Sequence, residues 1–315
     1  MMNKYILFLL VPVLLLAKAP HENAWSTPWF TGPLLAPSAS CNKLREVSWQ
    51  PYLFFTNTFG TFDNNWNRKN TSDMWAIQPL IDITYGIASF MDLEVTPSFV
   101  YQTSGGSSSI RMNDTPLFLG FQALRQSEAS WFPDLRISLH QIFPFGQCDK
   151  LNPKKNGTDS SGKGSFQSGV SFDFQKTFKM SVEHYFRLRW SISGILFASN
   201  VHVTGLNAYG GSPATNGDVT PGKTYTFYLS GEYTATRNWG FAFDTVYTLI
   251  TPDHFSGTKG RSLVGSPTSH QISFAPAVEY NYSESFGLIA GTWFTLVGKN
   301  ASQFYSGIIS AVITY

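Results

Sequence analysis

The end of the chain alternates between two kinds of side chain with a strict period of two. Every second position from Tyr305 to Tyr315 is apolar, aromatic or glycine, and three of the five positions between them carry a hydroxyl group. Neighbouring side chains of a β-strand point to opposite faces, so this period indicates a strand with one more apolar face. We therefore expect a sheet whose last strand keeps an apolar face up to its final aromatic ring.

The same alternation recurs from Val47 onward. In one segment Trp75 and Ile77 share a face, while Gln78 and Asp82 lie on the other. Most segments reach the roughly 9–11 residues that a tilted strand needs to cross a bilayer. We predict twelve strands, with the ranges 47–59, 74–85, 91–101, 114–125, 134–145, 165–178, 182–198, 223–235, 239–250, 269–280, 285–297 and 303–315.

The connections between these segments alternate between long and short. The long ones are rich in Gly, Ser, Asn and Asp, which is typical of solvated, mobile loops. Outer-membrane barrels show this asymmetry because their extracellular loops are long and their periplasmic turns are short. An even number of strands then places both ends of the barrel in the periplasm. The long connections are 60–73, 102–113, 146–164, 199–222 and 251–268; short ones lie near 86–90, 179–181, 236–238 and 281–284, a medium turn near 126–133, and a short outer loop near 298–302.

The composition favours a membrane barrel over a secreted β-sandwich, which is the alternative. Charged residues make up 13% of the chain, about half the usual share, whereas aromatic residues reach 16%. This balance suits a wall with one lipid-facing side and one wet side. In hydrocarbon an open sheet edge is not tolerated, so the first strand must pair with the last. The predicted fold class is all-β, a single antiparallel transmembrane β-barrel of twelve strands, with ten or fourteen as the alternatives.

The N-terminal residues predict export. Lys4 precedes an apolar run that is too short for a membrane-spanning helix, and Ala17-Lys18-Ala19 offers a processing site. We therefore predict a signal peptide over 1–24, with cleavage near 19–24, and the barrel over 47–315. Without Lys4 and Lys18 the 22 basic residues become 20, equal to the 20 acidic ones, so the charge balance does not indicate nucleic-acid binding.

The residues between signal and barrel, 25–46, form a Pro-rich periplasmic segment. Its prolines prevent a long strand or helix. The sequence favours a flexible lead-in, and the alternative is a plug that folds into the barrel mouth. The candidate contact residues of such a plug are Trp29, Phe30, Leu34 and Leu35.

Parity along the strands places ionisable side chains in the lumen. If the turn near 179–181 is tight, Asp173 lies opposite Arg187 and forms a cross-strand ion pair. The sequence favours the interpretation that these charges fill and rigidify a narrow wet interior. The alternative is that Arg187 and Arg189, one above the other against nearby acids, create a transverse field that selects polar solutes. The lumen candidates are Asp82, Glu94, Arg136, His140, Asp173, Arg187, Arg189, Glu232, Asp244 and Glu279.

No catalytic, metal or cofactor site is predicted. Cys41 and Cys148 fall on opposite sides of the membrane in this topology, so we expect no disulfide between them. Ser138 and His140 share an inner face, but a nucleophile also needs an oriented third group, which the sequence does not supply.

Two resemblances point to the same class of protein. The closing strand, with Ile313 and Tyr315, resembles that of bacterial outer-membrane β-barrels, in which a terminal aromatic residue belongs to the signal read by the barrel assembly machinery. The stretch Trp29-Phe30-Thr31-Gly32-Pro33-Leu34-Leu35-Ala36-Pro37, together with Pro51-Tyr52, Gly291-Thr292-Trp293-Phe294 and Gly298-Lys299-Asn300-Ala301, is similar to the family named for the meta-pathway of phenol degradation. This resemblance implies an outer-membrane location and uptake of small, partly apolar molecules, without catalytic residues.

The expected function is passive passage or uptake of small-molecule solutes by a barrel embedded in outer-membrane lipids. The alternative is a structural or adhesion barrel that binds host or surface ligands through long loops such as 148–164 and 200–222. A third, less favoured alternative is an outer-membrane lipid hydrolase.

Overall fold

The computed structural model describes residues 28–127 and 131–315 of the protein. The predicted signal peptide and its cleavage region lie outside these residues. Within them, nearly all regular structure is β-strand, and η1 (Pro153–Lys155) is a single 3₁₀ turn. None of the helical structure in this part of the chain is long and apolar enough to cross a membrane.

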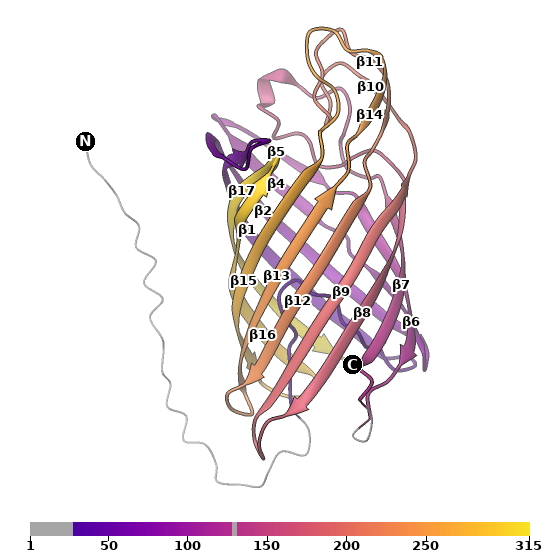
Figure 1. The fold of residues 1–315 in the computed structure, drawn as a ribbon, viewed down its shortest axis with the longest axis vertical. Coiled ribbons are helices and arrows are strands. Elements are labelled where there is room, and N and C mark those ends of the chain that lie inside the picture. Colours follow the sequence, from indigo (N-terminus) through magenta and orange to yellow (C-terminus); the bar gives the residue numbers. More distant parts are fainter. Residues whose placement is uncertain (1–27, 128–130) are drawn as a thin grey trace, which may run out of the picture.

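The strands form one closed antiparallel barrel (Figure 1). Two of the twelve barrel strands are each interrupted, so the described residues contain fourteen strand segments in this sheet. The interrupted strands are β3 (Met91–Val95) with β4 (Phe99–Ser104), and β5 (Ser107–Met112) with β6 (Thr115–Leu124). The others are β1 (Val47–Phe62), β2 (Arg68–Ala88), β7 (Asp134–Phe143), β8 (Gln167–Lys179), β9 (Tyr185–Ala198), β12 (Thr224–Thr234), β13 (Trp239–Ile250), β15 (Ser269–Asn281), β16 (Phe286–Lys299) and β17 (Ala301–Thr314).

The first and last strands close the barrel, as predicted. β1 pairs with β17 along its length, from Ser48 opposite Thr314 to Phe62 opposite Ala301. At the seam the N–H of Val47 donates to the carbonyl of Tyr315 (3.1 Å), and the N–H of Tyr315 donates to the carbonyl of Val47 (2.9 Å). The backbone edges that would otherwise be unpaired in lipid are thus satisfied.

Two of the predicted long loops are wrong, because the strands continue past the expected membrane boundary. β1 and β2 extend to a short connection at 63–67 in place of the loop 60–73. The loop 102–113 is a hairpin in which β4 and β5 meet at Gly105-Gly106, whose φ angles are +55° and +78°. Consecutive glycines permit the positive φ angles of a tight hairpin turn. Outside the bilayer both faces of a strand meet water, so the alternation that marks a strand in the sequence fades there.

Part of the remaining extracellular connections is folded rather than irregular. β10 (Val201–Thr204), β11 (Asn216–Thr220) and β14 (His254–Thr258) form a separate three-stranded sheet above the barrel (Figure 1). Apolar residues of this sheet and of the adjoining loops are buried together: Val201, Val203, Tyr209, Val219 and Val264. The prediction of loops at 199–222 and 251–268 holds for the connectivity but missed this sheet.

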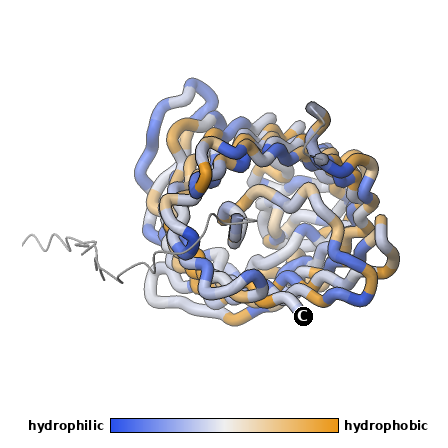
Figure 2. Tube along the Cα trace, turned by 90° about the horizontal axis from the view of Figure 1, so that it is seen from below, coloured by the Kyte–Doolittle hydropathy of each residue, from blue (hydrophilic) through white to orange (hydrophobic). Residues whose placement is uncertain are grey.

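The barrel exterior is apolar where the sequence predicts a lipid face. Trp75, Ile77 and Tyr85 of β2 are all exposed, and exposed aromatic and aliphatic side chains recur around the wall. In the hydropathy colouring of Figure 2, hydrophobic and hydrophilic positions alternate along the tube. Such an exterior on a closed barrel is the architecture of outer-membrane proteins, and the protein accordingly spans a bacterial outer membrane.

Candidate functional site in the barrel lumen

The residues before β1 run through the inside of the barrel. Leu34 and Ala39 are 2% and 0% exposed, although neither belongs to a strand. Figure 2, which looks into the barrel from below, shows chain crossing the bore. We call residues 28–46 the inner segment. The sequence favoured a flexible lead-in here, whereas the structure gives this segment defined contacts with the wall.

Wall side chains hold the inner segment by its backbone. Carboxylates or an amide accept hydrogen bonds from five of its N–H groups, which the segment cannot satisfy internally because its prolines prevent regular structure. Each bond joins residues far apart in the sequence. The bonds run from Thr31 to Glu279 (3.0 Å), from Leu35 and Ala36 to Asp244 (3.1 Å each), from Cys41 to Gln122 (2.8 Å) and from Asn42 to Asp92 (3.1 Å).

Side chains of the inner segment add apolar and aromatic contacts. Leu34 packs into a buried cluster formed by small and aliphatic wall residues, and Leu35 lies at its edge. A Cβ at Gly291 would approach Leu34 Cδ1 to 2.8 Å, so the glycine makes room for the leucine. The guanidinium of Arg187 lies 4.1 Å from the centre of the Phe30 ring, a cation–π distance. Arg237 lies 4.3 Å from Trp29 in the same way.

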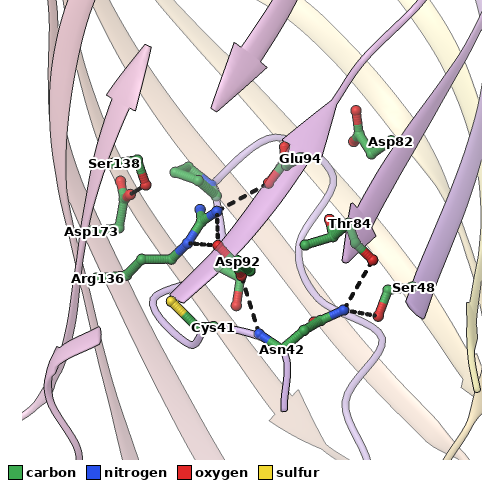
Figure 3. A network of polar contacts seen from close by, with 12 residues as sticks. Cys41, Asn42, Ser48, Asp82, Thr84, Asp92, Glu94, Arg136, Ser138 and Asp173 are labelled. Carbon is green, nitrogen blue, oxygen red and sulfur yellow. Dashed lines mark hydrogen bonds and ion pairs between the residues drawn. The ribbon is translucent and has the colours of Figure 1, made fainter. Parts of the chain in front are cut away.

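One side of the lumen contains an ion-pair network around Arg136 (Figure 3). Arg136 Nη2 lies 2.8 Å from Asp92 Oδ1 and 3.4 Å from Glu94 Oε2. A Cβ at Gly120 would overlap both Arg136 and Asp92, so this glycine is required by the close approach. Asp92 also accepts from the inner segment, so the network ties that segment to the wall. Asp82 stands apart and accepts one hydrogen bond, from the Thr96 hydroxyl (2.6 Å).

A second network surrounds Glu232. Arg187 contacts both of its oxygens, and Arg189 Nε lies 3.4 Å from Oε2. Arg189 also donates to the carbonyl of Ala36 in the inner segment (3.4 Å). The two guanidinium groups therefore share one carboxylate rather than facing the lumen as free cations.

The predicted ion pair between Asp173 and Arg187 is wrong. The turn between β8 and β9 spans residues 180–184 and is longer than the tight turn that the pairing requires. As a result Asp173 lies opposite Ser191, and Arg187 lies opposite Thr177. Asp173 instead accepts hydrogen bonds from three hydroxyl groups, those of Ser138, Ser171 and Ser191.

The ten lumen candidates all come from barrel strands, and six of them are almost fully buried. Asp82, Glu94, His140 and Arg187 are half-buried; the buried ones are Arg136, Asp173, Arg189, Glu232, Asp244 and Glu279. The sequence missed Asp92, which its alternation with Glu94 could have indicated. It also missed Gln122, for which the sequence carries no signal.

A cavity of about 630 Å³ remains between the inner segment and the wall. Its lining mixes rings with ionisable groups: Tyr52, Phe118 and Tyr228 beside Asp82, Glu94 and Arg136. The cavity is thus large enough for a small organic molecule and offers it both apolar and polar contacts.

The geometry gives Ser138 and His140 no shared chemistry. Ser138 donates to Asp173 at 3.4 Å, and the His140 ring packs edge-on against Phe118 with centroids 4.7 Å apart. Across residues 28–127 and 131–315, no group of three or more His, Cys, Asp or Glu side chains could hold a metal ion. Cys41 and Cys148 are free thiols, one in the inner segment and one in the extracellular loops.

Comparison with known proteins supports the fold. No family model and no curated protein sequence matches the chain. An outer-membrane channel from Pseudomonas putida F1 has a similar structure, with a TM-score of 0.67 and 13% identity over 90% of this chain and all of that one. The β-domain of a Bordetella autotransporter gives 0.46 and 10% over 87% and 100%, and the Pseudomonas putida toluene transporter TodX gives 0.41 and 9% over 88% and 90%. At these identities the first likeness shows a shared fold, and the other two are too distant to carry an argument.

Proposed function

We propose that the protein is an outer-membrane channel for passive uptake of small, partly apolar molecules, and that the inner segment is its plug. The observation that carries the proposal is the cavity inside a closed barrel, between the inner segment and a polar wall. A barrel that serves only as a scaffold could fill its interior with side chains, as eight-stranded barrels do. Here twelve strands enclose both a chain segment and open volume.

The lining of the cavity supports the solute class. Rings of Tyr52 and Phe118 offer apolar surface, while Asp82 and Glu94 offer hydrogen-bond acceptors. A solute with an apolar body and a polar group would satisfy both. The resemblance to the phenol meta-pathway family points in the same direction, and the similar channel from Pseudomonas putida F1 shows that this architecture suits an outer-membrane channel.

The plug role is supported by how the inner segment is held. Its hydrogen bonds reach β3, β6, β13 and β15, so one short segment connects opposite parts of the wall. Passage therefore requires that the segment shift, or that solutes use the cavity beside it.

Liposome swelling tests both parts of the proposal. Proteoliposomes of the mature chain should swell with small neutral solutes, and a variant lacking residues 29–42 should swell faster and admit larger ones. Lys259→Ala, on an exposed loop, should behave like the unaltered protein. Absence of swelling with both the mature chain and the deletion variant would contradict the channel. Equal rates for these two would contradict the plug.

One observation favours the alternative of a surface-interaction barrel. The extracellular sheet β10–β11–β14 has its own buried core, which a connection between pore strands does not need. Shortening the loop 205–215 should leave swelling unchanged under the channel proposal. Loss of host-cell adhesion with that variant, without loss of swelling, would assign the sheet a binding role of its own.

A further inference from the structure

The charges of the lumen are unevenly matched. The lumen residues described above comprise seven carboxylates and three arginines: Asp82, Asp92, Glu94, Asp173, Glu232, Asp244 and Glu279 against Arg136, Arg187 and Arg189. Arg136 is shared by Asp92 and Glu94, and the other two arginines are shared by Glu232. All three guanidinium groups are therefore committed to ion pairs.

Four lumen carboxylates have no basic side chain within ion-pair distance among the described residues. Asp82 and Asp173 accept from hydroxyl groups. Asp244 and Glu279 accept chiefly from backbone N–H groups of the inner segment. Hydroxyl and N–H donors orient a carboxylate without cancelling its charge, so a fixed negative charge remains in the bore whenever these groups are ionised.

The cavity makes part of this negative charge available to a ligand. The cavity brings Asp82 and Glu94, both half-buried, to the same open volume as the rings of Tyr52 and Phe118. Aromatic faces attract ammonium groups, so acids and rings favour the same kind of solute.

The three arginines of the lumen do not offset this excess of negative charge by attracting anions. Arg136 and Arg189 are 3% and 8% exposed, and each is in contact with a carboxylate. Arg187 is half-buried and, like the other two arginines, lines the cavity, but its guanidinium already contacts both oxygens of Glu232. An entering anion therefore meets no guanidinium that lacks a carboxylate partner. Charged groups lining a pore set its ion preference.

We infer that the bore selects cations, and that its organic solutes are small molecules with an aromatic or aliphatic body and a protonated amine. The inference rests on the proposed channel function and specifies the solute class of the same cavity. A negative potential that changes the energy of a unit charge by about one kT would raise the concentration of monovalent cations in the bore and lower that of anions, each by about 2.7-fold. The ratio of cations to anions would then rise about sevenfold.

Reversal potentials in planar bilayers test the inference directly. Under a potassium chloride gradient, the mature chain and the variant lacking residues 29–42 should both favour potassium. Asp82→Asn and Asp173→Asn should each lower the ratio of potassium to chloride permeability. Asp218→Asn removes an acid from the exposed loop sheet and should leave the ratio unchanged. Preference for chloride, or equal ratios in all variants, would overturn the inference.

A matched set of solutes extends the test to organic molecules. Uptake into proteoliposomes should be fastest for 2-phenylethylamine, intermediate for 2-phenylethanol and slowest for phenylacetate, which share one ring and differ in charge. Equal or faster uptake of phenylacetate would contradict the inference while leaving the channel intact. If neither the mature chain nor the deletion variant conducts or takes up any of the three, the channel function itself fails.

Discussion

Asp244 offers the sharpest test of how the inner segment is held. This side chain projects from β13 and accepts the N–H groups of Leu35 and Ala36, each at 3.1 Å. It also accepts the hydroxyl of Ser230, which belongs to the wall and does not depend on the segment. Asp244→Ala therefore removes two of the five N–H bonds that dock the segment, without altering the residues that dock.

The size of the effect follows from these two bonds. A hydrogen bond to a charged group contributes about 1.5–3 kcal/mol, so losing both disfavours the docked state by about 3 kcal/mol at the lower end of that range. Each 1.4 kcal/mol changes an equilibrium constant about tenfold. The ratio of undocked to docked segment should therefore rise about a hundredfold. Asp244→Asn keeps one acceptor oxygen and should give an intermediate rise of about tenfold.

Single-channel recording provides the measurement, with open probability as the readout of undocking. Asp173→Asn is the matched control, because Asp173 is equally buried but accepts from wall serines and does not contact the segment. An open probability that rises equally in Asp244→Ala and Asp173→Asn would show that loss of any lumen carboxylate has this effect. The reasoning about backbone docking would then be refuted.

Three further predictions concern other parts of the molecule. Arg136→Met leaves Asp92 and Glu94 without their cation and should lower the free energy of unfolding by about 3–5 kcal/mol in urea titrations. The control Arg111→Met, at an exposed site, should change the free energy of unfolding by no more than about 0.5 kcal/mol. Equal losses in the two variants would contradict the stabilising role of the network. Burial, with Asp149 and Asp114 nearby, raises the pKa of the Cys148 thiol, so less thiolate is present at neutral pH. A membrane-impermeant maleimide should therefore label Cys148 slowly on intact cells at neutral pH, and faster as the pH rises. An exposed cysteine introduced as Ser256→Cys in a Cys148→Ser background should label quickly at neutral pH, and equal rates would count against the raised pKa of the half-buried Cys148 thiol. Tyr315→Ala keeps the backbone hydrogen bonds to Val47 but removes the terminal ring, so it should reduce the amount of heat-modifiable barrel in the outer membrane. Tyr282→Ala, at another exposed tyrosine, should not reduce it. Normal assembly of Tyr315→Ala would exclude the ring from the assembly signal.

The sequence predicts which way side chains point better than which residues meet. Alternation along β2 and β7 placed Asp82 and Arg136 inward because one face of each strand contacts lipid, and lipid tolerates few charges. Which residues pair across two strands depends on the length of the turn between them, and turn length is hard to predict from the sequence. The misplaced partner of Asp173 follows from a turn longer than expected between β8 and β9.

The docking of the inner segment could not be predicted in the same way. Of the five hydrogen bonds that its backbone N–H groups donate to wall side chains, three reach carboxylates more than two hundred residues away, as from Thr31 to Glu279. A backbone donor is the same for nearly every residue type, so it leaves no mark in the sequence. The prolines indicated that residues 25–46 would form no regular structure, and the carboxylates looked like ordinary lumen charges.

Because the wall binds main-chain amides, the side chains of the bonded residues of the inner segment are not needed for those contacts, whereas Trp29, Phe30 and Leu34 hold the segment through their own side chains. Mutations in this segment could reshape the surface that a passing compound meets while the backbone hydrogen bonds persist, provided that no proline replaces a residue whose N–H donates one of them. The pore thus combines an inner segment whose exposed side chains can vary with a barrel wall that stays constant. Related barrels could therefore diverge in the solutes they admit without changes in their walls.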